Sequence, residues 1–135
     1  AAFAGSDHGL LAICLHANGA SVVAGDRAVS PLDVARQNVR EMCRRVPPLE
    51  LRLGEGLSVL EEGEVDTVCI AGLGERLGDN KAQRSWRSRA SPNFAALGVH
   101  RLVLQPMDAR LDYMLCLRVW LRENDWRITQ VTSVA

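Results

Sequence analysis

Short apolar runs that end in glycine or an acidic residue recur along this chain, and a segment of helical periodicity follows most of them. The runs are AAFAGSDHG at residues 1–9, AGDR at 24–27, RLGEGL at 52–57 and CIAGLG at 69–74. A buried strand that turns sharply into a helix has this pattern, and such a turn brings backbone N–H groups close to a ligand. Because parallel strands end at one edge of a sheet, these repeated ends predict a single pocket.

Hydrophobic periodicity predicts that strands and helices alternate along the chain. We expect helices at residues 10–16, at 30–43 after an N-cap and proline at Ser30-Pro31, and at 108–123. After the first strand, further strands are expected at residues 21–25, 49–53, 66–71, 99–104 and 126–134. This order predicts an α/β fold: a Rossmann-like, doubly wound, mostly parallel sheet that binds ligands at the carboxyl ends of its strands.

Burial is predicted from the same pattern. The helix at 10–16 is largely apolar and the helix at 108–123 has apolar residues on nearly every side, so both are expected to be well buried. Trp120 and Trp126 are expected in the core. The acidic turn at 61–64 is expected to be a solvated surface.

Length and composition indicate one folded domain over residues 1–135. A hydrophobic content of 47% is enough for a core, and a formal net charge of zero gives no overall field that would recruit nucleic acid. We find no signal peptide and no apolar run long enough to span a bilayer. The chain opens on a strand without an initiator Met, so we interpret it as a fragment, trimmed at both ends.

The cysteines give no sign of a metal site. Cys14, Cys43, Cys69 and Cys116 are spaced singly, unlike the pairs of zinc sites or small disulfide scaffolds. We expect buried, reduced thiols, which fits a cytoplasmic location, and no metal.

Carboxylates at the strand ends indicate a nucleoside-containing ligand. The first turn has Leu10 where the third glycine of GxGxxG would fall, which disfavours a nicotinamide-dependent oxidoreductase. Asp26 ends the second strand, where a carboxylate can accept both ribose hydroxyls; its other interpretation is an exposed turn residue. Glu55, between Gly54 and Gly56, can face an adenine amino group, or can simply lie in a surface turn.

Several motifs, in this order, resemble the TrmK family of tRNA (adenine-22-N1)-methyltransferases, class I enzymes that use S-adenosyl-L-methionine (SAM). They are GSDHGLL, AGDRAVSPLDVARQNV, LRLGEGLSVL, GEVDTVCIAGLG and RLVLQP. The resemblance covers residues 1–128 and is weakest at 75–100. It implies that the chain acts on tRNA or another structured RNA.

The resemblance also implies roles for individual residues. The amino-acid end of SAM would be wrapped by Gly5, Ser6, Asp7 and His8, and the ribose would be held by Asp26 beside Arg27. The adenine would lie at Gly54, Glu55 and Gly56, the reaction centre would be bordered by Ala71, Gly72 and Leu73, and the target base would lie near Gln105 and Pro106.

Asp7 matches the family's proposed catalytic carboxylate. A carboxylate near the exocyclic amine could orient the base and accept the proton shed as adenine N1 is alkylated. Asp7 could instead cap the following helix, and both roles could coexist. His8 is more simply a hydrogen-bonded turn histidine than a base.

The chain departs from the family pattern at Phe3, where the family has an acid, at Glu75, where it has glycine, and at Met107, where it has asparagine. These departures motivate a rival hypothesis, a methyltransferase fold that has lost catalysis and serves as an RNA-binding or scaffold module. The basic segment at 81–89, KAQRSWRSR, could contact phosphates and stack on a base, or could be a solvated loop.

Overall fold

The computed structural model describes residues 2–5, 9–42, 49–54, 56–73, 94–106 and 111–133. Its strands are β1 (Ala2–Gly5), β2 (Val22–Asp26), β3 (Leu49–Leu53), β4 (Thr67–Leu73) and β5 (Arg101–Pro106). Its helices are α1 (Leu10–Ala17), α2 (Val29–Met42), the 3₁₀ helix η2 (Gly56–Val59), α4 (Phe94–Leu97) and α5 (Leu111–Glu123). The predicted alternation of strands and helices is confirmed.

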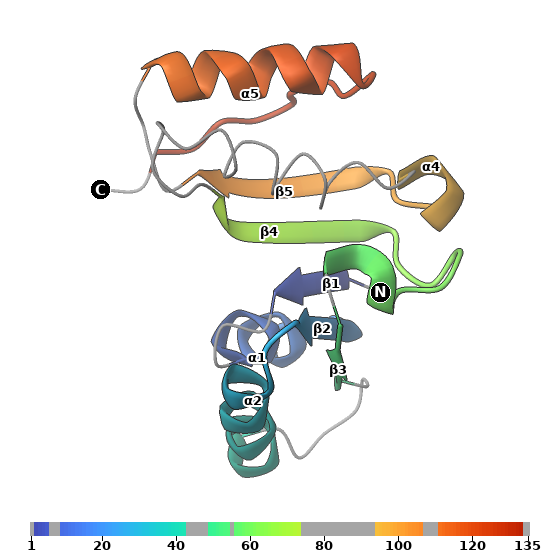
Figure 1. Ribbon diagram of the computed structural model, residues 1–135, viewed down its shortest axis with the longest axis vertical. Helices are drawn as coiled ribbons and strands as arrows, with labels where there is room; N and C mark the ends of the chain where they lie inside the picture. Colours follow the sequence, from blue (N-terminus) through green and yellow to red (C-terminus); the bar gives the residue numbers. More distant parts are fainter. Residues whose placement is uncertain are drawn as a thin grey trace.

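The five strands form one parallel sheet in the order β3-β2-β1-β4-β5, and the arrowheads of β1, β2 and β5 point the same way in Figure 1. The chain first builds outward from β1 through β2 to β3. It then crosses to the other side of β1 and adds β4 and β5. The carboxyl ends of β1 and β4 therefore mark the topological switch point of the sheet, where open α/β folds bind ligands. This is the predicted Rossmann-like, doubly wound fold.

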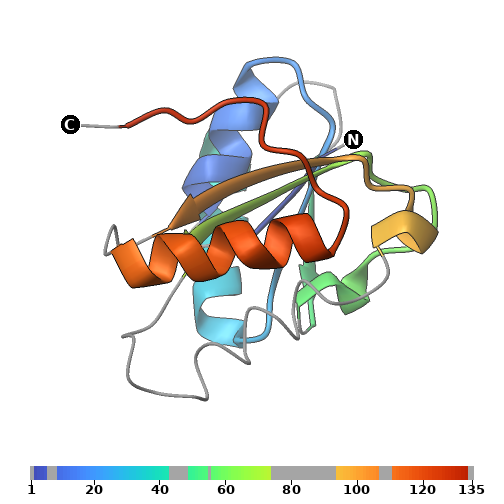
Figure 2. The ribbon, with the colours of Figure 1, turned by 90° about the horizontal axis from the view of Figure 1, so that it is seen from above.

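Helices cover the sheet on two faces, and α1 and α5 lie on opposite sides of it in Figure 2. Alternation along β2 decides which core each residue joins. Val22 and Ala24 pack with Ala12 of α1. Val23 faces the other way, into a larger core that includes Val68 of β4, Phe94 of α4 and Leu117, Trp120 and Leu121 of α5.

Several boundaries differ from the prediction by one or two residues. Helix α2 begins at Val29, so Ser30 lies inside its first turn rather than capping it. The Asp26 Oδ1 atom accepts a hydrogen bond from Ala28 N at 2.9 Å, just before the helix begins. Strand β5 begins at Arg101 rather than residue 99, and His100 N and Arg101 N both donate to the carbonyl of Asp66, the residue just before β4.

The sixth strand expected at 126–134 is wrong, because residues 126–133 form no strand. Trp126 anchors the beginning of this segment: its N–H donates to Leu121 O at 2.8 Å, and its ring meets Phe94 edge to face with centroids 5.5 Å apart. The two rings pack against the larger core, as expected for Trp126. Beyond it, alternating apolar residues have no described strand to pair with, and pairing is what makes a strand.

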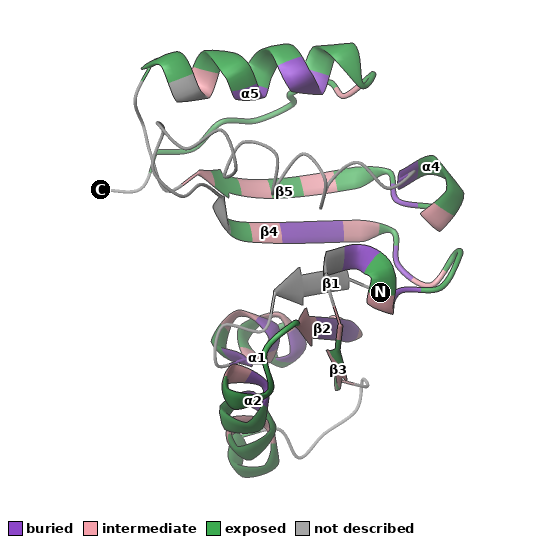
Figure 3. Cartoon of the chain, in the orientation of Figure 1, coloured by how far each residue is buried: buried purple, intermediate pink, exposed green. Residues whose placement is uncertain are grey.

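The predicted burial of two helices is also wrong in part. On α5 only one side is buried, while Leu111, Leu115 and Val119 are 75%, 51% and 42% exposed. Figure 3 shows α5 mostly green, with the buried residues confined to a small part of it. On α1, Leu10 is 58% exposed and the buried residues are Ala12 and His16. A helix packed on one face of a sheet buries one side only, whatever its composition.

Exposure also corrects the prediction for the cysteines. Cys14 and Cys116 are exposed free thiols, whereas Cys69 on β4 is buried, and burial raises the pKa of its thiol. Cys43 lies outside the described residues. The expectation of buried thiols therefore holds for Cys69 alone among the three cysteines described.

Candidate active site at the carboxyl edge of the sheet

The first strand ends at Gly5, which lies opposite Gly25 of β2 in the parallel register. The next three predicted site residues, Ser6, Asp7 and His8, lie outside the described residues. The chain is described again at Gly9, which has a φ of 76°, and a Cβ there would lie 3.1 Å from Ala35 Cβ of α2. Gly9 therefore needs to be glycine both for its left-handed backbone and for the close approach of this turn to α2.

Asp26 ends the second strand with its side chain half-buried. Its carboxylate is oriented by the hydrogen bond from Ala28 N, and its carbonyl accepts a hydrogen bond from Gly54 N at 2.9 Å. The second contact ties the end of β2 to the turn that follows β3. Arg27, the next residue, is exposed.

The turn after β3 is tightly packed against η2. A Cβ at Gly54 would lie 2.4 Å from Val59 Cγ1, a distance that real Cβ atoms do not show. Packing against Val59 therefore favours glycine at this position. Glu55 lies outside the described residues, and Gly56 begins η2.

The other half of the edge is formed by β4 and β5. Ala71 pairs with Gln105 and Leu73 with Pro106, with an irregularity of register between Ala71 and Leu73. Strand β4 continues to Leu73, past Cys69, the last of its residues paired with β1. Ala71 and Gln105 are exposed, so both are accessible at this edge. Gly72 lies within the same strand end.

The fold thus brings together two groups of predicted site residues on either side of the switch point. Gly5, Asp26 and Gly54 lie on one side, and Ala71–Leu73 with Gln105 and Pro106 lie on the other. Among the departures from the family pattern, Glu75 and Met107 lie outside the described residues, as does the basic segment at 81–89. For Phe3 the structure describes the backbone within β1.

Sequence reasoning missed a cluster beside this edge, centred on Arg52 of β3. The Arg52 Nη1 atom donates to Glu64 Oε2 at 2.8 Å and to Val59 O at 2.9 Å, and Nη2 donates to Glu64 Oε1 at 2.5 Å. Nη2 also donates to Glu50 Oε2 at 2.7 Å. The acidic turn at 61–64 is therefore not simply solvated: Glu64 is 23% exposed and paired.

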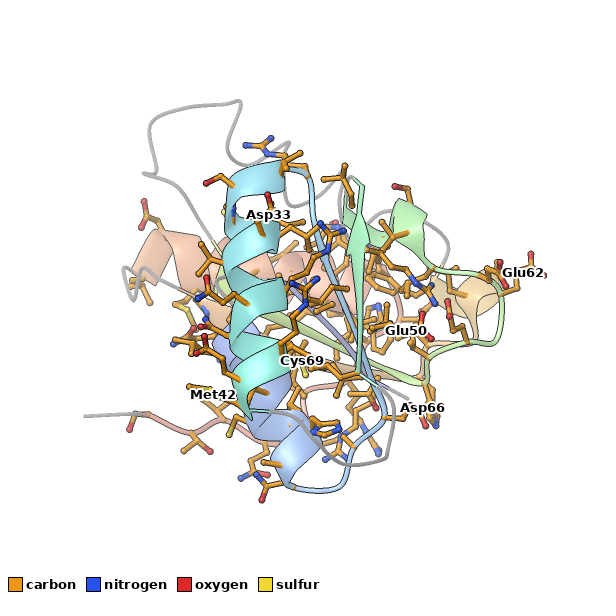
Figure 4. The ribbon with its side chains drawn as sticks, turned by 90° about the horizontal axis from the view of Figure 1, so that it is seen from below. Asp33, Met42, Glu50, Glu62, Asp66 and Cys69 are labelled. Atoms are coloured by element: carbon orange, nitrogen blue, oxygen red, sulfur yellow. The ribbon has the colours of Figure 1, made fainter. Side chains whose placement is uncertain are left out.

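The Arg52 hydrogen bonds lower the pKa of Glu64 from 4.5 to about 2, and the N–H of Glu61 contributes to the same shift. The carboxylates raise the pKa of Arg52 further above its already high value. One signal in the sequence could have indicated part of this cluster. Glu50 and Arg52 are two residues apart on a strand and so share a face, and Figure 4 labels Glu50 on β3.

Among the residues that the structure describes, no group of three or more His, Cys, Asp or Glu side chains could hold a metal ion. No helix in the described part of the chain is long and apolar enough to cross a bilayer.

A protein-family profile described as "Methyltransferase domain" matches residues 2–135. The chain belongs to this family. Membership agrees with the parallel sheet and with the strand ends gathered at its switch point. No protein with a curated description matched the chain.

Several solved structures are similar to this methyltransferase domain. A protein of the NADB-Rossmann superfamily from Streptococcus agalactiae is 32% identical with a TM-score of 0.74, the match covering 96% of this chain and 53% of that one. A putative tRNA (m1A22) methyltransferase of Streptococcus pneumoniae, in complex with SAM, is 28% identical with a TM-score of 0.68, over 98% and 60% of the two chains.

M. capricolum TrmK in complex with S-adenosyl-homocysteine (SAH) shares the fold, with a TM-score of 0.75 at 20% identity, over 99% of this chain and 56% of that chain. The chain spans about half the length of the solved chains that it matches. These findings confirm the TrmK-like resemblance of this methyltransferase domain.

Proposed function

We propose that this domain binds SAM at the carboxyl edge of its sheet and is the catalytic domain of a tRNA methyltransferase that modifies N1 of adenine 22. The observation that carries the proposal is the position of Asp26. Its carboxylate is held at the end of β2 by Ala28, and its backbone is joined to Gly54 of the neighbouring turn. It lies one strand from Gly5 at the switch point, where a nucleoside ligand is bound in such folds.

The residues present fit the adenosine part of SAM. A carboxylate at the end of β2 can accept hydrogen bonds from both ribose hydroxyls, and Gly54 holds the next turn beside Asp26 through its N–H. In this proposal Glu55 and Gly56 lie at the adenine, Gly5 to His8 surround the amino-acid end, and Arg27 lies beside the ribose site. Ala71, Gly72 and Leu73 border the reaction centre.

SAM supplies an electrophilic methyl group, so the chain has to position the base and accept the one proton that the base releases. Gln105 and Pro106 lie across from Ala71 and Leu73, where they can border the target adenine. Asp7 is proposed to orient the exocyclic amine and accept the proton released as N1 is alkylated. Positioning can supply much of the acceleration, because N1 is already nucleophilic.

The rival hypothesis of a non-catalytic scaffold is not favoured. The family match spans the chain, and a similar solved protein is in complex with SAM. A tRNA substrate fits a cytoplasmic location, as well as an organelle that contains tRNA.

Cofactor binding is tested by calorimetric titration with SAM and with SAH. We expect micromolar dissociation constants for the unmodified chain. Asp26→Ala removes the ribose acceptor and should weaken binding at least about tenfold, the effect of losing a charged hydrogen bond. The matched control is Asp33→Ala, an exposed carboxylate of α2 that pairs with Arg36 and is labelled in Figure 4. Equal affinity of the Asp26 variant and the control would refute the ribose assignment.

Substrate choice is tested with the full natural protein, labelled SAM and tRNA transcripts that carry A or G at position 22. Methyl transfer to the A22 transcript alone is expected. Asp7→Asn should retain SAM affinity and lose turnover. Equal labelling of both transcripts would refute adenine 22 as the target.

A further inference from the structure

We propose that Arg52 is a positioning residue for the SAM site: it holds η2 against the turn after β3, and so sets the place of Gly54 and Asp26. This inference rests on the proposed function, because it concerns the ribose end of the same site. Arg52 itself has no proposed contact with the cofactor.

The Arg52 guanidinium bridges separate parts of the chain. It connects strand β3 to two points of the following segment, the carbonyl of Val59 at the end of η2 and the carboxylate of Glu64. The pairing with Glu64 is bidentate, since each Nη atom donates to a different carboxylate oxygen. A planar fork of this kind fixes direction as well as distance, which lysine cannot do.

Glu64 is itself held in place. Its Oε2 atom accepts a hydrogen bond from Glu61 N at 3.0 Å, so its carboxylate is fixed by its own turn before it meets Arg52. Both side chains of this pair are about three-quarters shielded, at 26% and 23% exposed. Glu50, in contrast, is 57% exposed and adds a partner at the outer side of the guanidinium.

Contacts of η2 with the turn after β3 connect it to the site. Val59, whose carbonyl Arg52 binds, packs its Cγ1 methyl group so close to Gly54 that a Cβ there would clash with it. Gly54 in turn donates its N–H to the carbonyl of Asp26. The path from Arg52 to the proposed ribose ligand therefore consists of a hydrogen bond, a close packing contact and a second hydrogen bond.

The test compares Arg52→Lys and Glu64→Gln with the unmodified chain at a temperature where circular dichroism shows all of them folded. SAH is the titrant, and its dissociation constant is measured by calorimetry. We expect both variants to bind SAH about tenfold more weakly, as befits the loss of charged hydrogen bonds that orient a site. We also expect the Gly54 amide to exchange with solvent faster in both, as measured by NMR.

Two controls separate positioning from a general loss of stability. Glu50→Gln removes the charge of the exposed partner and should leave both the SAH affinity and the Gly54 exchange rate unchanged. Leu117→Ala lowers stability in the core beneath α5 and should leave the SAH affinity of the folded protein unchanged. If Arg52→Lys behaves like Leu117→Ala, with lower stability and normal affinity, Arg52 is structural only and the inference is overturned.

The outcomes also separate this inference from the proposed function. Failure of the unmodified chain to bind SAM or SAH overturns both. A second outcome is that the unmodified chain binds SAH, Asp26→Ala does not, and Arg52→Lys and Glu64→Gln bind it normally. This outcome supports the proposed function and overturns the role of Arg52. Weakened binding with faster Gly54 exchange in both variants supports the inference.

Discussion

At the scale of single residues, the site depends on contacts that a glycine allows. A side chain at Gly54 would clash with Val59 Cγ1 unless Val59 moved. At the same time its N–H joins the end of β2. Gly54, in the predicted cofactor site, is therefore constrained both by packing and by a backbone hydrogen bond.

Substitution of Gly54 tests this contact. Gly54→Ala should destabilise the domain by about 1–3 kcal/mol, the usual cost of overpacking. Val59→Ala in the same chain removes the opposing methyl groups and should recover part of the loss. Urea unfolding of the two single variants and the double variant measures the coupling. Additive effects would show that the two side chains do not meet.

The low pKa of Glu64 predicts how stability depends on pH. Because the carboxyl pKa falls from 4.5 to about 2 on folding, its contribution is complete above about pH 4.5 and is lost as the pH falls toward 2. Its size should be on the order of 1–3 kcal/mol after allowing for partial exposure. The difference in unfolding free energy between the unmodified chain and Glu64→Gln should be constant above pH 5 and shrink below it. A difference that stays constant at low pH would contradict the pairing.

At the scale of elements, α5 shows how a single packing face decides burial. Leu117, Trp120 and Leu121 lie in the core, whereas Leu111, Leu115 and Val119 are exposed. The two sets are equally apolar in sequence, so hydrophobicity alone does not separate them. The buried residues are those on the side of α5 that packs against the sheet.

Two alanine substitutions in α5 test this division. Leu117→Ala should cost about 2–5 kcal/mol, because it leaves a cavity in the core. Leu115→Ala, on the exposed side of the same helix, should change stability by no more than about 0.5 kcal/mol. Thermal or urea unfolding provides both values. A large loss at Leu115 would mean that this side of α5 is covered.

At the scale of the whole molecule, the parallel sheet should be the most stable part and the segment after α5 the least. Strand β1 has a partner on each side, β2 and β4, whereas residues 127–133 have no strand partner among the described residues. Native-state hydrogen exchange should therefore show the slowest amides in β1 and β4 and rapid exchange at 127–133. Slow exchange throughout 127–133 would contradict this expectation and would indicate that these residues form the sixth strand predicted from the sequence.

Much of the fold was predictable because it depends on local patterns. The bounds of β3 agree with the predicted 49–53, and the alternation of strands and helices predicted a parallel sheet. Asp26 and Gly54 were recognised as strand-end residues, because a short apolar run that ends in an acid or a glycine is visible in the sequence. Their roles toward SAM stay predictions.

Tertiary structure decided what depends on partners distant in the sequence. The segment at 126–133 alternates like a strand but has no described strand beside it, and α5 looks apolar all round but meets the sheet on one side. Arg52 and Glu64 look like ordinary charged residues, yet the path of the chain through η2 brings them together. The sequence by itself determined the order of the elements and the residue types at the strand ends, because these follow from local periodicity. Which faces are buried, and which charges meet, was decided only when the chain had folded.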